Sequence, residues 1–266
     1  MKKNVFSRRQ LAVPYAIFLF LFVIIPLFVL IYFGFTDENG RISFANFLHF
    51  FGSGKTIGTL LYSIVIALCT TIFCLILAYP VAFFLAKGNF GRKQVWIMLF
   101  VLPMWINFTL RITALKEILT VLEGNLAYHP FFNTVLCMVY DFLPFMILPL
   151  YQALCKLDNS LIEAALDLGA SEFQVFYKVV FPLSIPGIIS GVTMVFLPSM
   201  TNYVVLDMVY NSTYIMGSLI GSYFSSYDWN NGSVISVILL LMICAVTLLS
   251  ERFTKQEQIE KKSVLK

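Results

Sequence analysis

Long apolar runs constrain the fold of this 266-residue chain more than any other feature. A helix needs about 20 consecutive apolar residues to cross the roughly 30 Å hydrocarbon core of a bilayer. Six stretches reach or nearly reach this length: residues 11–33, 57–86, 95–115, 131–154, 183–207 and 234–250. We therefore predict an all-α integral membrane protein with six transmembrane helices.

The composition agrees with a membrane protein and disfavours several other functional classes. Charged residues make up 12% of the chain, against about 25% in soluble domains. The net charge of +4 comes from Lys and Arg at the chain ends and in one short loop, without the soluble basic face that a nucleic-acid partner requires. The five cysteines and two histidines lack metal-ligand spacing, and no catalytic set such as HExxH is present. We therefore expect neither a metal site nor an intramembrane enzyme.

The distribution of positive charge predicts the orientation in the membrane. An even number of spans places both termini on one side. If both termini lie on the inner side, all but four of the 18 Lys and Arg residues fall in inner segments. The four exceptions, in outer loops or within a span, are Arg41, Lys55, Arg111 and Lys116. Because inner segments are enriched in Lys and Arg, we expect one transmembrane domain over residues 1–266 with both termini in the cytoplasm.

Two capping patterns predict two short helices in the inner loop formed by residues 156–182. Ser160-x-x-Glu163 fits the capping box that begins a helix, and Gly169 can end that helix in the left-handed conformation. Ser171-x-x-Gln174 repeats the starting pattern directly afterwards. The loop is thus expected to fold as a helix–glycine–helix elbow.

The faces of these two helices indicate what the elbow contacts. The second helix is expected to end before Pro182. Its apolar stripe, at helical spacing, consists of Phe173, Phe176, Tyr177 and Val180. The first helix carries Glu163 and Asp167 four residues apart. Membrane-surface helices usually have faces rich in Lys and Arg, so this acidic face favours a protein partner over a helix that merely covers the end of the bundle.

The same loop carries a family resemblance. The stretch "EAALDLGASEFQVFYKVVFP" (residues 163–182) resembles the EAA loop of ABC-importer permeases, in which E-A-A, a glycine and a proline recur at fixed spacing. Val179 and Phe181 replace the usual Ile and Leu and keep their apolar character. In that family the loop is a coupling helix that inserts into a groove on a cytosolic ATPase. The resemblance assigns ATPase coupling to Glu163, Ala164, Ala165, Asp167, Gly169 and Pro182.

Three further stretches resemble the B-type permease subunit of spermidine/putrescine importers. They are "LAYPVAFFLAK" (residues 77–87), "LPMWINFTLRI" (102–112) and "LPFMILPLYQALCKLD" (143–158). The resemblance implies a type I ABC importer (MetI-like) permease fold in a bacterial cell membrane, forming half of a translocation pathway. It also implies three kinds of partner: a second homologous permease, an ATPase dimer and an extracytoplasmic substrate-binding protein. The alternative is the same class of permease with another cargo, such as an oxyanion, ferric iron or thiamine.

ATP chemistry is expected in a partner chain. The stretch "GSGKT" (Gly52–Thr56) suggests a phosphate-binding loop, but His49 occupies the position of the first glycine of that motif. With no other nucleotide-binding pattern in the sequence, we expect a transport subunit that is not an enzyme and holds no cofactor. The ATP and Mg²⁺ would be bound by the ATPase.

The cargo suggests which side chains could line the pathway. A polyamine is a flexible cation, so its path needs sparse carboxylates and aromatic faces, whereas an anion would need basic residues. The candidates around the third, fourth and fifth spans are Trp105, Asn107, Thr109, Asp141, Tyr203 and Asp207. Arg111 is cationic and better suited to an ion pair or a gate than to direct contact with a polyamine.

Overall fold

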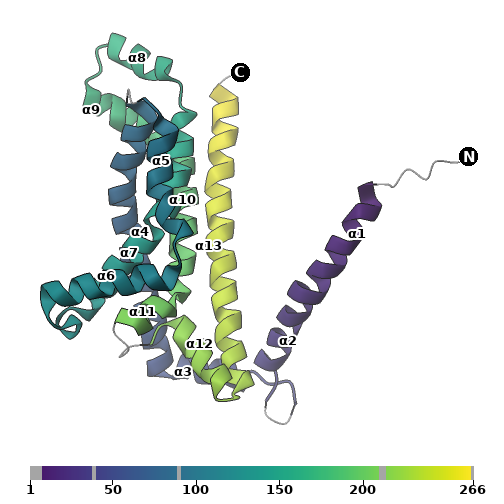
Figure 1. Cartoon of the computed structure of the whole chain (residues 1–266). Coiled ribbons are helices and arrows are strands. Elements are labelled where there is room, and N and C mark those ends of the chain that lie inside the picture. The colour runs from purple at the N-terminus through teal and green to yellow at the C-terminus, as the bar shows by residue number, and fades with distance from the viewer. Residues whose placement is uncertain (1–7, 38–39, 89–90, 210–213, 265–266) are drawn as a thin grey trace, which may run out of the picture. The chain divides into compact units, whose positions relative to one another are not determined.

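The computed structural model describes residues 8–37, 40–88, 91–209 and 214–264 (Figure 1). Over these residues the chain is helical apart from connecting turns, and no strand is present beyond one isolated bridge between Thr36 and Ile42. The α-helices are α1 (Arg8–Leu19), α2 (Ile25–Gly34), α3 (Ala45–Gly52), α4 (Gly54–Lys87), α5 (Lys93–Val101), α6 (Phe108–Glu123), α7 (Pro130–Cys155), α8 (Asn159–Asp167), α9 (Glu172–Val175), α10 (Phe181–Thr201), α11 (Tyr203–Val209), α12 (Met216–Ser225) and α13 (Trp229–Val264).

Tighter and wider helical turns connect some of these helices. Two π-helices continue the helical path without a break, η1 (Phe20–Ile24) between α1 and α2 and η4 (Phe176–Val180) between α9 and α10. Two 3₁₀-helices lie beside α6, namely η2 (Leu102–Trp105) before it and η3 (Leu126–Tyr128) after it.

Five helical segments are long and apolar enough to cross a membrane. They are Ala12–Gly34, Gly54–Lys87, Pro130–Cys155, Glu172–Thr201 and Trp229–Arg252. These segments confirm five of the predicted spans, at 11–33, 57–86, 131–154, 183–207 and 234–250, although their ends differ. A sixth candidate is a helix pair, Lys93–Trp105 and Phe108–Glu123, bent by 94°.

The bend shows that the predicted third span, residues 95–115, is wrong as one straight helix. Pro103 lies at the start of η2, and Ile106 leaves that turn with extended backbone angles. Asn107 then begins a new helix, because its side-chain Oδ1 accepts the backbone N–H groups of Thr109 at 3.0 Å and Leu110 at 3.4 Å. An N-cap of this kind satisfies amides that would otherwise lack partners, so α6 can start in a new direction.

The fifth predicted span, residues 183–207, is also corrected at both ends. Pro182 was expected to close the helix after Ser171, but it lies in the first turn of α10 and the chain stays helical through η4. A proline inside a helix removes one backbone N–H donor, and a π-turn such as η4 directly before it is one of the local adjustments by which membrane helices accommodate that loss. At the other end α10 stops at Thr201, and Tyr203 begins the separate helix α11.

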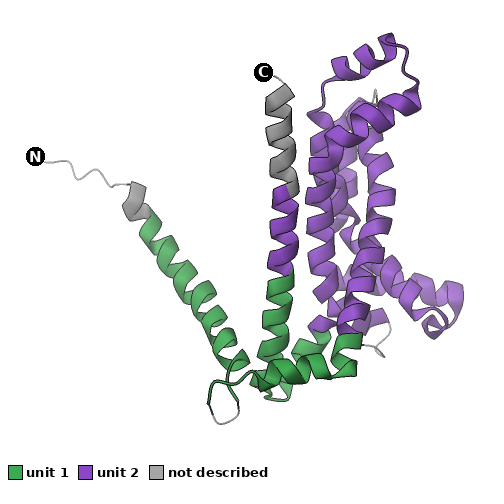
Figure 2. Ribbon diagram, turned by 180° about the vertical axis from the view of Figure 1, so that it is seen from behind, with its two compact units in different colours: residues 1–58, 218–242 green, residues 59–217, 243–266 purple. Residues whose placement is uncertain are grey.

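The chain forms two compact units (Figure 2). Unit 1 comprises residues 1–58 and 218–242, and unit 2 comprises residues 59–217 and 243–266. Within unit 1 the side-chain amide of Asn230 donates to the backbone carbonyls of Phe33, at 3.1 Å, and Thr36. The ring of Trp229 lies 6.4 Å from that of Phe33. The prediction of a single domain over residues 1–266 stays a prediction.

The centre of unit 2 is the contact between α7 and α10. Met146, Leu150 and Leu154 of α7 are fully buried there. Gly187 of α10 allows the close approach. A Cβ atom at Gly187 would lie 2.5 Å from Cβ of Ala153 and 2.9 Å from the carbonyl oxygen of Pro149. These distances are too short for a side chain, so Gly187 serves the packing of two helices.

We expect Gly187→Val to lower the thermal unfolding midpoint of the purified permease by roughly 5 °C or more, because the added side chain meets backbone that cannot move aside. Gly191→Ala is the matched control, since its Cβ would meet the flexible end of Met146. That variant should unfold close to the wild-type temperature. Unchanged unfolding of Gly187→Val in detergent would contradict the close contact.

Candidate functional site

The elbow, defined here as Asp158–Val180, lies beyond the ends of α4, α5 and α10 within unit 2 (Figure 1). Its first helix does not begin with the predicted Ser160–Glu163 capping box. The cap is Asp158, whose Oδ1 accepts the backbone N–H of Ser160 at 3.0 Å. Aspartate is as good an N-cap as serine, and its charge also favours a helix N-terminus. The helix therefore begins at Asn159, earlier than expected.

The environment of Asp158 favours its charged form. The hydrogen bonds from Ser160 hold the pKa of the Asp158 carboxyl below its usual value, and the positive charge of Lys87 acts in the same direction. A carboxyl whose pKa is lower in the folded state stabilises that state above its unfolded pKa. The cap is therefore present at neutral pH and is lost as the pH falls through the folded pKa.

The end of α8 confirms the predicted role of Gly169. Its φ of +84° is left-handed, and its N–H donates to the carbonyl of Leu166 at 2.9 Å. The next amide, that of Ala170, donates to the carbonyl of Ala165 at 3.1 Å. This pair of bonds is a Schellman motif, which satisfies the last carbonyls of a helix and reverses the chain.

The second predicted capping box is confirmed. The N–H of Gln174 donates to Oγ of Ser171 at 3.3 Å, and the N–H of Ser171 donates to Oε1 of Gln174 at 3.0 Å. Gly169 ends α8 and this capping box begins α9, so the direction of the chain is fixed on both sides of the turn between the two helices. The elbow is a defined structure even though most of its side chains are exposed.

The predicted apolar stripe on the second helix is wrong in part. Phe176 and Val180 point into unit 2, but Phe173 and Tyr177 are exposed, Phe173 at 76%. The buried positions are Val175 and Val180, with Phe176 and Val179 partly buried. This face still has helical spacing, but it is rotated from the predicted stripe, so that Val175 and Val179 take the places expected for Phe173 and Tyr177.

Five of the six residues assigned to ATPase coupling lie on the elbow, and Pro182 lies two residues after its end, in α10. Glu163, Ala164, Asp167, Gly169 and Pro182 are exposed, and Ala165 is half-buried. Exposed apolar side chains accompany them, with Leu168 at 89% exposure and Leu161 and Leu166 close to half. The elbow thus offers carboxylates beside leucines, which suits a protein surface that has both basic and apolar groups. The coupling role of the six residues stays a prediction.

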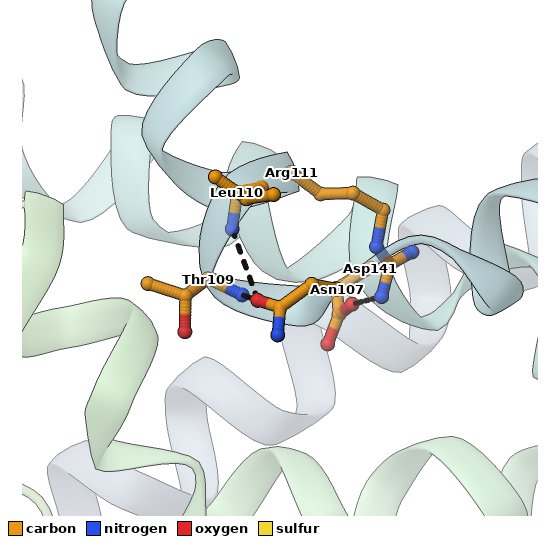
Figure 3. A network of polar contacts seen from close by, with 5 residues as sticks. All are labelled: Asn107, Thr109, Leu110, Arg111 and Asp141. Carbon is orange, nitrogen blue, oxygen red and sulfur yellow. Dashed lines mark hydrogen bonds and ion pairs between the residues drawn. The ribbon is translucent and has the colours of Figure 1, made fainter.

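Arg111 and Asp141 form a buried ion pair between α6 and α7 (Figure 3). Nη2 of Arg111 donates to Oδ1 of Asp141, and the two residues are only 8% and 4% exposed. Nε and Nη1 of Arg111 have no acceptor among the described residues, while the ring centroid of Tyr140 lies 6.0 Å from Cζ. The ion pair expected for Arg111 is therefore confirmed. Asp141 faces this arginine, and its place on the substrate pathway stays a prediction.

The other pathway candidates lie on elements that adjoin one another. Trp105, 84% exposed, ends η2, while Asn107 caps α6 and Thr109 lies in its first turn. Tyr203 and Asp207 are exposed on α11, which contacts both α6 and α7. The six candidates therefore occupy one region of unit 2, on three contacting helices and the bend before α6, and their contact with cargo stays a prediction.

Two features beside the elbow were missed from the sequence. A cavity of about 510 Å³ opens between α7, α8 and α10, with Gln152, Lys156, Asp158 and Ser190 among its lining residues. Lys87, the last residue of α4, donates from Nζ to the carbonyl of Leu157 at 2.5 Å and to Oδ1 of Asn159 at 2.8 Å. A lysine at a helix end is the signal that could have indicated such a contact, because its amine suits unpaired carbonyls.

The fold and the site together define a class. Helices of membrane-spanning length, two of them joined by a capped and exposed acidic elbow, are typical of a multi-pass membrane protein. The chain belongs to the family of binding-protein-dependent transport system inner membrane components, whose sequence profile matches residues 5–256. It is therefore a permease component of such a transport system.

Similar proteins carry a more particular name. A spermidine/putrescine transport system permease protein PotB from Haemophilus influenzae is 38% identical over 201 residues, covering 70% of each chain. The protein of the same name from Escherichia coli K12 is 36% identical over 200 residues, covering 69% of this chain and 73% of its own. A PotB homolog from Mycoplasma pneumoniae is 31% identical over 232 residues, covering 84% of this chain and 80% of its own.

Solved structures share the fold. A bacterial ABC transporter involved in alginate import matches with a TM-score of 0.73 at 14% identity, covering 92% of this chain and 95% of that chain. The MetNI methionine ABC transporter, in an inward-facing conformation, matches with a TM-score of 0.59 at 16% identity, covering 77% and 98%. These likenesses confirm the predicted MetI-like permease fold of type I ABC importers.

Proposed function

We propose that this chain is the permease subunit of an ATP-driven importer of polyamines, spermidine or putrescine, and that it forms half of the translocation pathway. The observation that carries the proposal is the elbow. Its capped helices present Glu163, Asp167 and exposed leucines at the positions of the EAA pattern. Relatives between 31% and 38% identical that bear the spermidine/putrescine name support the cargo.

The partners follow from this role. The elbow docks into a groove of a cytosolic ATPase dimer, which binds the ATP and Mg²⁺ that this chain does not need. Burying Leu168 and Phe173 in that groove removes exposed apolar surface from water, which favours docking. A second homologous permease completes the pathway, and an extracytoplasmic binding protein delivers the cargo. The elbow and both termini lie on the cytoplasmic side of the bacterial membrane.

Transport requires that docking change the membrane helices. The elbow continues without interruption through η4 into α10, so a displacement caused by ATP-driven closure of the ATPase reaches α10 directly. Because α10 is closely packed against α7, the two move as one body. Such a movement could alternate the accessible side of the pathway. Asp207 and Trp105 are the residues we assign to cargo contact first, since a carboxylate and an aromatic face both attract an ammonium group.

We expect Asp207→Asn to raise the KM for spermidine about tenfold, because one charge-assisted hydrogen bond contributes about 1.5–3 kcal/mol. The measurement is ATP-dependent uptake of labelled spermidine by the complete complex reconstituted in vesicles. Glu117→Gln, an exposed acid on α6, is the control and should leave KM unchanged. Unaltered KM in Asp207→Asn would exclude the residue from the pathway. A wild-type complex that fails to import spermidine or putrescine would reject the cargo itself, and ATP-dependent uptake of an oxyanion, ferric iron or thiamine by that complex would identify the alternative.

A further inference from the structure

The end of α4 contacts both arms of the elbow, although the chain connects the elbow only to α7 and α10. On the first arm, Nζ of Lys87 donates to the carbonyl of Leu157 at 2.5 Å and to Oδ1 of Asn159 at 2.8 Å. Leu157 follows the end of α7, and Asn159 is the first residue of α8. One amine therefore joins α4 to the junction of two other helices.

Aromatic side chains make the contact with the second arm. The ring of Phe176, in η4, lies 5.6 Å from that of Tyr79 and 5.9 Å from that of Phe83, both edge to face. The hydroxyl of Tyr79 also lies 2.9 Å from Oγ of Ser184, and the two oxygens share a hydrogen bond. The last two and a half turns of α4 thus meet the elbow at its beginning and at its end.

The two contacts differ in what they can transmit. Packed rings resist compression but allow sliding, because their attraction is weak and only loosely directional. The bonds of Lys87 are directional and charge-assisted, and they lie where the carbonyl end of α7 attracts a cation. The charge of Asp158, the N-cap of α8, interacts with Lys87 as well. Rotation or withdrawal of α8 therefore pulls on α4 through Lys87.

A second lysine in the same region makes a contrasting contact. Nζ of Lys93 donates to the carbonyl of Ala86 at 2.9 Å, which joins α5 to the end of α4 and does not reach the elbow. The two lysines lie six residues apart in sequence and both bond a backbone carbonyl. Their difference is that only Lys87 bonds α8.

We propose that Lys87 is a positioning residue for transport coupling, which fixes α8 to α4 so that displacement of the elbow moves α4 together with α10. This inference rests on the proposed coupling of the elbow to an ATPase. Lys87 touches neither cargo nor nucleotide in this role. It sets the fraction of ATP hydrolysis that is converted into movement of the membrane helices.

The test measures ATP hydrolysed per spermidine imported by the complete reconstituted complex. Lys87→Met keeps most of the length of the unbranched side chain and removes the donors, and it is expected to raise this ratio at least about fivefold, as the loss of an ordinary coupling free energy would. Lys87→Arg keeps a cation with N–H donors and should remain within about twofold of the wild type. Lys93→Met is the matched control and should leave the ratio unchanged. Asn159→Ala removes one of the two acceptors and should raise the ratio by a smaller factor.

Hydrogen exchange of the backbone amides of α8 in the assembled complex gives a readout that needs no transport. Lys87→Met should exchange several-fold faster than the wild type over residues 159–168, and Lys87→Arg and Lys93→Met should not. An unchanged ratio and unchanged exchange in Lys87→Met would overturn the proposal, and so would a variant whose only defect is a smaller amount of complex. If the wild-type complex imports no polyamine, the proposed cargo fails while the exchange comparison still decides whether Lys87 holds α8.

Discussion

The Gly169→Val permease is expected to insert into the membrane normally and to lose at least about tenfold of its ATP-coupled uptake. The φ of Gly169 is +84°, a conformation that costs a β-branched residue of the order of 1–3 kcal/mol. The Schellman turn would relax, and the two arms of the elbow would change their relative direction. Helices in the membrane should be unaffected, because among the described residues none beyond the two chain neighbours of Gly169 has an atom within 4 Å of the position a Cβ would take. Vesicle uptake, ATP hydrolysis and the amount of inserted protein are the three measurements.

Controls separate the backbone effect from the effect of a new side chain. Gly169→Asn introduces a side chain of similar volume that tolerates the left-handed conformation, so it should retain most of the uptake. A bulky charge at the half-buried Ala165, as in Ala165→Glu, should uncouple hydrolysis from uptake through the docking face, with the turn intact. Coupled uptake at the wild-type rate in both Gly169→Val and Ala165→Glu would reject the elbow as the coupling element.

Local rules predicted those parts of the structure that local interactions determine. The left-handed Gly169 and the box of Ser171 and Gln174 were predicted because each depends on residues within one turn. Five spans were predicted because hydropathy over about 20 residues is sufficient to indicate a membrane helix. At the start of α8 the predicted cap, Ser160, was wrong, because Asp158 two residues earlier is an equally good N-cap and is the one that the structure uses.

The remaining features depend on contacts that no window of sequence contains. The helix pair on either side of Asn107 is, taken together, apolar enough to count as one span, so a hydropathy window alone does not indicate the 94° change of direction. The π-turn after Val175 is accommodated by the burial of Phe176 against Tyr79 and Phe83, far away in sequence. The partner of Arg111 is thirty residues distant, and Lys87 reaches a carbonyl seventy residues away. Tertiary contacts select among local alternatives in each of these places.

The ion pair of Arg111 and Asp141 gives the second large expected effect. Asp141→Ala should destabilise the permease by about 3–5 kcal/mol, because it leaves a buried guanidinium without its carboxylate. Nε and Nη1 already lack acceptors among the described residues, so little remains to compensate the charge. Arginine cannot become neutral by losing a proton. We expect the variant to give little monodisperse protein in detergent and a strongly lowered unfolding midpoint.

Replacing the arginine instead of the aspartate should destabilise the permease less, and this difference between the two single variants is the more specific test. Arg111→Met leaves Asp141 buried, but a carboxyl can take up a proton and become neutral in apolar surroundings. The double variant Arg111→Met/Asp141→Leu has no buried charge, and replacing a buried pair by apolar residues is often close to neutral. It should therefore be more stable than Asp141→Ala. In the double-mutant cycle closed by the single variants Arg111→Met and Asp141→Leu, we expect a coupling energy well above the uncertainty of about 0.5 kcal/mol. Additive losses would show that the pair contributes no mutual stabilisation.

Uptake by the double variant then decides what the pair is for. If the pair only joins α6 to α7, restored stability brings restored uptake, because an apolar contact can replace it. If Asp141 is part of the pathway, the stable double variant still fails to import spermidine at the wild-type rate, since the carboxylate that would attract the cation is gone. Stability and uptake are therefore measured on the same double variant. Their comparison assigns Asp141 either to the contact between α6 and α7 or to the path of the cargo.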